Sequence, residues 1–168
     1  IGTRLNWREI ALLRAYARYL RQVHFPYSVE YIAETMANHL HIAGGIVELF
    51  LTRFSPVFEG DEDWRAQRED EVEKRILDSL EQVENLGEDR IFRQFVLVIK
   101  ATMRTNFFQQ EGDGSLKPYF SFKLKPRDIP GIPQPVPLYE IYVYSPRVEG
   151  VHLRGGKVAR GGLRWSDR

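Results

Sequence analysis

Residues 89–108 read DRIFRQFVLVIKATMRTNFF, a stretch much more apolar than residues 61–84 before it. Its apolar side chains leave few polar faces, which is typical of a helix buried on most sides. We therefore expect a central helix over residues 89–108, within an N-terminal part made only of helices. After this stretch the hydrophobic period changes from that of helices to that of strands.

The sequence before the central stretch predicts four more helices. Asn6 and Glu9 have the spacing of a capping box, and Ser28 is a suitable cap for the second helix. Gly44 and Gly45 lie inside the third helical pattern. Because each glycine costs a helix about 1 kcal/mol against alanine, the pair predicts close packing against another helix. The four expected helices cover residues 5–23, 29–38, 40–54 and 61–84.

The sequence after the central stretch predicts strands. Five prolines in residues 126–137 exclude a regular helix or a central strand there and indicate an extended connector. Gly155-Gly156 is the expected turn between the last two strands. The expected strands cover residues 119–124, 138–144, 148–154 and 158–165.

The expected fold class is therefore α+β. We expect a helical module of about five helices over residues 1–110, then a loop and proline-rich connector with one strand over 111–137. Residues 138–168 are expected to form the β-rich, truncated start of a further domain. The chain begins at Ile1, not Met, and ends straight after a glycine-rich turn, so we expect it to be a piece of a longer protein.

Composition excludes several classes of protein. The chain has no cysteine, which excludes disulfides, thiolate zinc sites and a cysteine nucleophile, and which fits a cytoplasmic location. No apolar run reaches the roughly 20 residues that a membrane helix needs, so no membrane association is expected. The net charge of +1 hides segregation. Residues 59–90 are strongly acidic, which indicates a solvated helix face or a docking surface for a basic partner. Residues 145–168 are basic and would attract a carboxylate, a phosphate or nucleic acid.

The familiar catalytic and metal motifs are missing from the sequence. His39 and His41 are two residues apart and would point to different sides of a helix, so they do not form a metal pair. No Walker loop, GxGxxG or nucleophile elbow occurs. We expect no catalytic residue, no cofactor-binding residue and no metal ligand in this chain.

Residues 155–168 read GGKVARGGLRWSDR and contain two glycine pairs accompanied by cationic side chains. Glycine lets the backbone approach a small anion closely, while a guanidinium can bind it through two hydrogen bonds. A tight hairpin turn with exposed arginines explains the same pattern. The spacing alone leaves both interpretations open.

Residues 139–168, YEIYVYSPRVEGVHLRGGKVARGGLRWSDR, resemble the large-subunit class of bacterial NAD-specific glutamate dehydrogenase. Upstream, FPYS at 25–28, ATMRTN at 101–106 and KPYFSFKL at 117–124 are similar to the region before the catalytic domain in that family. The resemblance spans most of the chain and is most specific at its C-terminal end.

The resemblance also implies substrate-binding residues. In the smaller glutamate dehydrogenases a Lys-Gly-Gly-[Ile/Leu]-Arg-[aromatic] motif lines the glutamate site, and its lysine binds a substrate carboxylate. The matching run here is Arg160-Gly161-Gly162-Leu163-Arg164-Trp165. It implies that Arg160 binds the carboxylate, that Gly161 and Gly162 make room for the substrate, and that Arg164 holds the motif through buried pairing. Arg160 stands where those enzymes have lysine, and the two cations are not interchangeable. Whether it replaces that lysine is therefore open.

For the parent enzyme the resemblance implies oxidative deamination of L-glutamate to 2-oxoglutarate and ammonia, with hydride transfer to NAD, in amino-acid catabolism and in a homo-oligomer. In the family, the catalytic lysine and the NAD-binding domain lie beyond the segment that matches Arg168, so we expect this fragment to be inactive alone. The alternative hypothesis is a non-catalytic helical interaction module whose basic tail binds an anion or RNA. The aromatic residues are not interleaved with the basic ones as stacking platforms, which speaks against nucleic acid.

Overall fold

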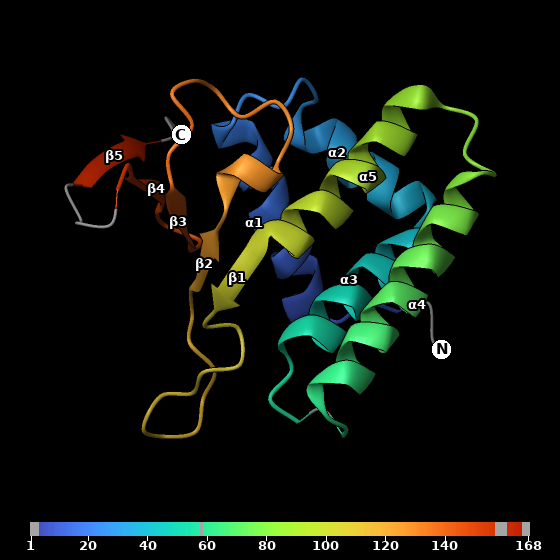
Figure 1. The fold of residues 1–168 in the computed structure, drawn as a ribbon, viewed down its shortest axis with the longest axis horizontal. Helices are drawn as coiled ribbons and strands as arrows, with labels where there is room; N and C mark the ends of the chain where they lie inside the picture. Colours follow the sequence, from blue (N-terminus) through green and yellow to red (C-terminus); the bar gives the residue numbers. More distant parts are fainter. Residues whose placement is uncertain (1–3, 58, 157–160, 166–168) are drawn as a thin grey trace.

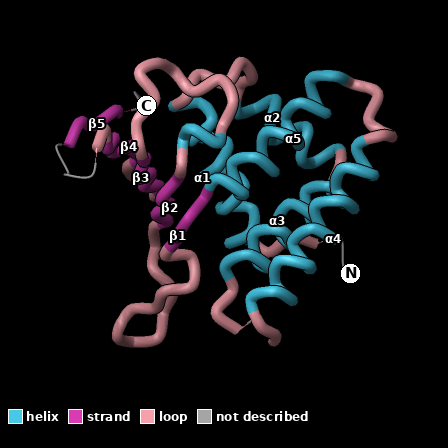
Figure 2. Tube along the Cα trace, in the orientation of Figure 1, coloured by secondary structure: helices cyan, strands magenta, loops and turns pink. Residues whose placement is uncertain are grey.

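The computed structural model describes residues 4–57, 59–156 and 161–165, the last of these as backbone only. In these residues five helices and a sheet of five strands form two sides of one body (Figures 1 and 2). The sheet lies at one end and α4 at the other. This arrangement confirms the α+β fold class. The helices are α1 (Trp7–Gln22), α2 (Val29–Asn38), α3 (Leu40–Phe54), α4 (Glu62–Leu80) and α5 (Leu86–Ala101).

Local capping signals begin the first two helices where the sequence predicts. The side chain of Asn6 accepts hydrogen bonds from the amides of Arg8 and Glu9 at 2.9 and 3.0 Å, and the Glu9 carboxylate accepts from the Asn6 amide at 2.8 Å. Ser28 Oγ accepts from the amide of Tyr31 at 3.1 Å. Each bond satisfies an amide that has no partner within the helix. The capping box and the serine cap are therefore confirmed.

The boundaries of α4 and α5 differ from the prediction. The fourth helix ends at Leu80, and Asn85 caps the start of α5 through hydrogen bonds from the amides of Gly87 and Glu88 at 2.8 and 3.3 Å. The predicted central helix over 89–108 is therefore wrong at both ends, because α5 covers Leu86–Ala101.

The C-terminal end of α5 is set by a strand that the sequence analysis missed. Strand β1 (Thr102–Thr105) follows α5 directly and pairs antiparallel with β2 (Phe120–Leu124). Thr102 is extended, with φ −72° and ψ 126°, and its hydroxyl donates to the carbonyl of Val98 at 2.8 Å. Pairing with a strand 18 residues further along the chain overrides the helical hydrophobic pattern at this point.

The sheet is antiparallel throughout and its strands lie in chain order. Strand β2 is followed by a short 3₁₀ turn at Pro126–Asp128 in the expected connector, then by β3 (Tyr139–Tyr144), β4 (Glu149–Arg154) and β5 (Gly161–Trp165). The described part of the last strand begins at Gly161. Residue 157 and the first three residues of the predicted strand over 158–165 lie outside the described residues.

One hydrophobic core joins the helices to the sheet. The ring of Tyr16 in α1 contacts Phe50 of α3 at 6.1 Å, Phe95 of α5 at 6.5 Å and Phe122 of β2 at 4.7 Å between centroids. All four side chains are almost fully buried. The position of the sheet is therefore set by the same side chains that pack the helices together.

The glycine pair in α3 has two different environments. An added Cβ at Gly45 would lie 2.9 Å from Cγ1 of Ile76 in α4, whereas at Gly44 it would meet nothing within 4 Å. Close helix packing is thus confirmed at Gly45 and is wrong as an explanation for Gly44.

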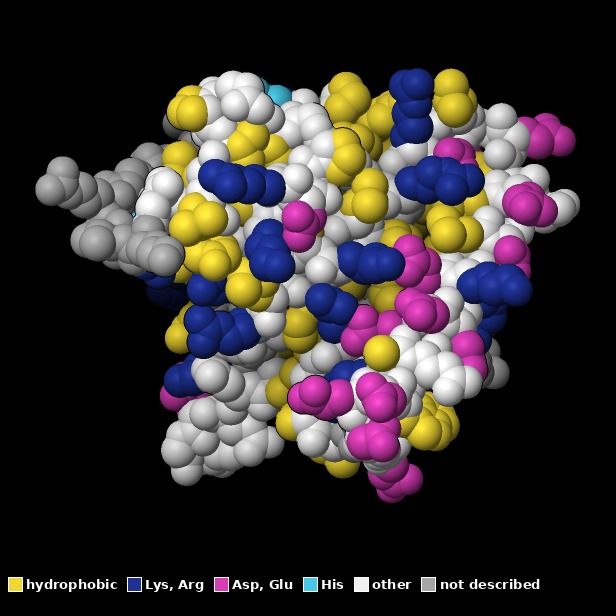
Figure 3. Space-filling view, in the orientation of Figure 1, with side chains coloured by type: hydrophobic (Ala, Val, Ile, Leu, Met, Phe, Trp, Pro, Cys, Tyr) yellow, Lys and Arg dark blue, Asp and Glu magenta, His cyan; other side chains and the backbone are white. Residues whose placement is uncertain are grey.

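The acidic block forms much of α4. This helix buries only Val72, Ile76 and Leu80. Figure 3 shows Asp and Glu side chains gathered on the α4 side of the molecule, with Lys and Arg among them. Several of these charges pair across helices, because Arg53 binds Glu69 and Lys100 binds Glu73, each at 2.5 Å. A solvated, ion-paired helix face therefore accounts for the acidic segment.

Candidate functional site

The candidate site is the backbone of the β4–β5 hairpin. Gly161 pairs with Arg154, Gly162 with Leu153 and Arg164 with Val151. Since β5 is the last strand of the described sheet, one of its edges has no strand neighbour among the described residues. Glycines in a strand permit a ligand or another backbone to approach closely. The structure thus places three of the four predicted site residues in one strand, while Arg160 lies outside the described residues.

An ion pair between a buried carboxylate and a half-buried guanidinium anchors β4 to α1. Glu149, only 5% exposed, lies with Oε2 3.1 Å from Nε of Arg18. Glu149 is the first residue of β4, and Val151, two residues on, is fully buried on the same face of the strand. The ion pair and the apolar contact together fix which face of β4 meets the core. Because β4 and β5 are paired in a defined register, the orientation of β4 also determines which face of β5 is turned toward the core.

A second buried carboxylate anchors β3. Glu140 is completely buried, and its Oε2 accepts a hydrogen bond of 2.6 Å from the hydroxyl of Tyr19 in α1. The rings of Tyr19 and Tyr142 also lie 5.5 Å apart. Neither Glu140 nor Glu149 was among the residues predicted to matter. The signal for Glu140 was its alternation with Tyr142 on one face of the predicted strand, which implies that the carboxylate faces the core with Tyr142.

His39 makes structural contacts with α5. His39 Nε2 lies 2.9 Å from a carboxylate oxygen of Glu88, and its ring packs edge-on against Phe92. Within residues 4–57 and 59–156 and the backbone of 161–165, no group of three or more His, Cys, Asp or Glu side chains is placed to hold a metal ion. Nor does any helix of this part combine the length and hydropathy needed to cross a bilayer.

The described residues do not fit a dinucleotide. Dinucleotide binding of the Rossmann type uses parallel strands joined by a helix, with the pyrophosphate at the helix N-terminus. Here every neighbouring pair of described strands is antiparallel, and no helix connects parallel strands. The described residues therefore contain no βαβ unit of the Rossmann type.

Two family comparisons cover most of the chain. Residues 75–168 match the family described as bacterial NAD-glutamate dehydrogenase, catalytic domain. Residues 1–56 match the family described as glutamate dehydrogenase, helical motif 3. The candidate hairpin lies inside the first match, and α1, α2 and α3 lie inside the second.

Individual relatives agree with the family matches. The chain is 55% identical over 164 residues to the NAD-specific glutamate dehydrogenase of Pseudomonas aeruginosa, covering 98% of this chain and 10% of the relative. It is 53% identical over 171 residues to that of Halomonas elongata and 44% identical over 165 residues to that of Mycobacterium tuberculosis. It spans about 10% of the length of each. Since one family model covers more than half of the chain, these 168 residues are a segment belonging to the bacterial NAD-glutamate dehydrogenase family.

Proposed function

We propose that the parent of this chain catalyses the NAD-dependent oxidative deamination of L-glutamate, in which L-glutamate, NAD and water give 2-oxoglutarate, ammonia and NADH. Membership of the family and the names of the relatives support this activity. In the parent, residues 1–110 serve as helical scaffold, and residues 138–168 form one wall of the glutamate site.

The observation that carries the substrate role is the glycine pair in strand β5. Gly161 and Gly162 lie at the end of the described sheet, in register with β4. The missing side chains leave space for a substrate beside the strand. Arg160 comes directly before the pair and binds a glutamate carboxylate, while Arg164 holds the motif through pairing. A guanidinium suits this role because it can donate two parallel hydrogen bonds to a carboxylate.

The remaining chemistry belongs to other parts of the parent. NAD accepts the hydride when it is bound, and the antiparallel sheet described here does not provide its binding fold. The lysine that activates water likewise comes from outside this segment. The 168-residue chain is therefore inactive alone. We also propose a cytoplasmic, homo-oligomeric parent that acts in glutamate catabolism, and the absence of cysteine is consistent with that location.

The test is Arg160→Ala in the full-length parent, assayed by NADH formation at varied L-glutamate. Loss of one charge-assisted carboxylate contact should lower kcat/KM by the equivalent of roughly 2–4 kcal/mol, mainly through a higher KM. Arg147→Ala is the matched control, since Arg147 lies in the same basic segment, is exposed in the β3–β4 turn, and should leave KM unchanged. An unchanged KM for Arg160→Ala would defeat the assignment.

Two companion measurements sharpen this test. Arg160→Lys separates charge from geometry, because retained activity means that a cation suffices without the guanidinium fork. NADH formation should be undetectable with the 168-residue chain and present in the full-length protein. A folded full-length protein that forms no NADH from L-glutamate would refute the dehydrogenase proposal.

The hypothesis of an RNA-binding tail gains no support from the described residues. The rings of Phe120, Phe122 and Tyr142 in the strands are buried in the core and cannot stack on bases. Strong RNA binding that weakens steeply with salt would be needed to revive it.

A further inference from the structure

One side of helix α1 faces away from the hydrophobic core and takes no part in the contacts of α1 with the sheet. Its inward side chains fill the core, but Trp7 is 73% exposed and Ile10 is 47% exposed. Arg14 follows at helical spacing and is also exposed. Large apolar side chains exposed together with a cation on one helix stripe are typical of an interaction surface.

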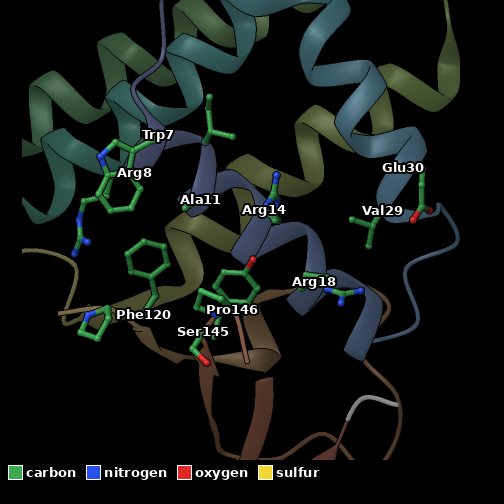
Figure 4. Close-up of a pocket in the computed structure, with 13 residues that line it drawn as sticks. Trp7, Arg8, Ala11, Arg14, Arg18, Val29, Glu30, Phe120, Ser145 and Pro146 are labelled. Atoms are coloured by element: carbon green, nitrogen blue, oxygen red, sulfur yellow. The ribbon is translucent and has the colours of Figure 1, made fainter. Parts of the chain in front are cut away.

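Two hollows flank this stripe and share part of their lining. The larger has a volume of about 720 Å³ and lies between α1 and the ends of strands β2 and β3, with Phe120 and Pro146 opposite the helix (Figure 4). The smaller, of about 240 Å³, lies between α1 and α2. Ile10 and Arg14 line both hollows, so the two form one surface, which we call the α1 groove.

The groove is elongated. Figure 4 shows Trp7 and Arg8 toward one end of α1 and Arg18 toward the other, with Phe120 and Pro146 along the facing wall. From Trp7 to Arg18 the helix rises about 16 Å, at about 1.5 Å for each residue, or three turns. This length and the apolar lining suit a helix lying alongside α1 better than a compact ligand.

The lining of the larger hollow carries more positive than negative charge. Arg8, Arg14 and Arg18 line it, against one carboxylate, Glu30. Arg18 is already paired with Glu149. Arg14 makes no hydrogen bond or ion pair with any residue in the described part of the chain.

Arg8 is the less usual of these cations. It is only 7% exposed, and its guanidinium lies 4.7 Å from the ring centroid of Phe107 and 5.0 Å from that of Phe120. It donates to the carbonyls of Phe107 at 2.5 Å and Lys117 at 3.3 Å, and its Nε has no acceptor among the described residues. Burial lowers the pKa of Arg8, so the protein holds a desolvated cation beside the hollow with no described carboxylate to balance it.

We propose that the α1 groove is the docking site for an amphipathic helix with acidic side chains along one flank, contributed by another part of the parent polypeptide. The apolar face of that helix covers Trp7 and Ile10, and its acidic flank faces Arg14. An occupant from the same polypeptide is favoured because about nine tenths of the length of the relatives lies outside the segment matched here. None of the residues that line the two hollows belongs to β4 or β5, and the proposal does not depend on Arg160.

The first test places the photo-crosslinker p-benzoylphenylalanine at Trp7 of the full-length parent. Trp64 on α4 is the matched control, because it is another exposed tryptophan, at 55%, and does not line the groove. Position 7 should crosslink to a peptide of the same chain that has acidic residues at helical spacing. Mixing ¹⁴N- and ¹⁵N-labelled protein should give no mixed-isotope product, because the contact is within one chain.

Any other product at position 7 overturns the proposal. A mixed-isotope product means a second copy, and a foreign peptide means a separate partner. No peptide product means a groove open to solvent or to a small ligand. The same peptide captured equally well from position 64 means non-specific labelling. None of these outcomes depends on dehydrogenase activity, so they are distinct from failure of the proposed function.

The second test examines the charge. Arg14→Glu should lower the crosslink yield at position 7 by about tenfold, because like charges placed together at an interface are costly. Arg21→Glu makes the same change on the same helix at an exposed residue that lines neither hollow, and it should keep the yield within about twofold. Equal yields for the two variants would refute the acidic flank. Amide hydrogen exchange over α1 verifies that both variants remain folded.

Discussion

The close contact between Gly45 of α3 and Ile76 of α4 can be measured by mutation, with the adjacent Gly44 as the control. Changing either glycine to alanine removes the same backbone freedom and should stabilise the helix by about 0.5–1 kcal/mol. At Gly44 an added Cβ meets nothing within 4 Å, so the full gain should appear as a higher free energy of unfolding.

At Gly45 the same methyl group would lie 2.9 Å from Cγ1 and 3.6 Å from Cδ1 of Ile76. Ile76 is 2% exposed and lies in the interface between α3 and α4, so it cannot move aside into solvent. Overpacking of this kind costs about 1–3 kcal/mol. Set against the backbone gain, Gly45→Ala should be neutral to destabilising by about 2 kcal/mol. Since the gain is common to both variants, the difference between them should be the packing cost itself, about 1–3 kcal/mol.

The assay is urea unfolding of the 168-residue chain followed by far-ultraviolet circular dichroism, with the slope in urea checked for constancy. The double variant Gly45→Ala/Ile76→Ala isolates the contact, because removing Cγ1 of Ile76 also removes the clash. Its destabilisation should be smaller than the sum of the two single changes by about 1–3 kcal/mol. If Gly45→Ala stabilises the chain as much as Gly44→Ala, the close approach of α3 to α4 is refuted.

Two further predictions concern the attachment of α1 to the sheet and the start of α2. Tyr19→Phe removes the hydroxyl that donates to the buried Glu140 carboxylate and should cost about 2–3 kcal/mol in urea unfolding, whereas Tyr16→Phe, which loses a bond to the Thr102 hydroxyl, should cost about 1 kcal/mol. If the two variants lose the same free energy of unfolding, the bond from Tyr19 to the Glu140 carboxylate is no stronger than a bond between two hydroxyl groups. Hydrogen bonds from its own backbone amide and from the hydroxyl that caps α2 hold the pKa of Glu30 below its usual 4.5. A carboxyl group whose pKa is lower in the folded than in the unfolded chain stabilises the fold at pH values above its ordinary pKa. This stabilisation is lost as the pH falls through the lowered pKa of the folded chain. Glu30→Gln should therefore be less stable than the unchanged chain at neutral pH and equal to it in acid, and a difference that persists in acid would contradict this origin.

The starts of α1 and α2 were predictable because the interactions that make them are local, whereas the equally local Asn85 cap of α5 was overlooked. Asn6 with Glu9, and Ser28, satisfy amides within three residues, so their spacing in the sequence was enough. The bounds of α2 and α3 also agree with the prediction, although no side-chain hydrogen bond caps the start of α3. The family was also readable from sequence, since the run around Gly161 and Gly162 is distinctive.

Contacts distant in sequence decided the rest. Ala101 ends α5 because Thr102 pairs with Leu124, and no pattern near residue 101 carries that information. Gly44 and Gly45 look alike in the sequence, and only the position of Ile76 separates them.

The same division holds for the candidate site. The glycine pair, the neighbouring arginines and the alternation of the strands can be read from the amino-acid sequence. The position of β4 and β5 as the last strands of the described sheet, and the contacts of Glu140 with Tyr19 and of Glu149 with Arg18, depend on how the chain folds. Burying a carboxylate is costly unless a hydrogen-bond donor or a cation meets it, and here the fold brings those partners from α1, more than 100 residues away in the sequence.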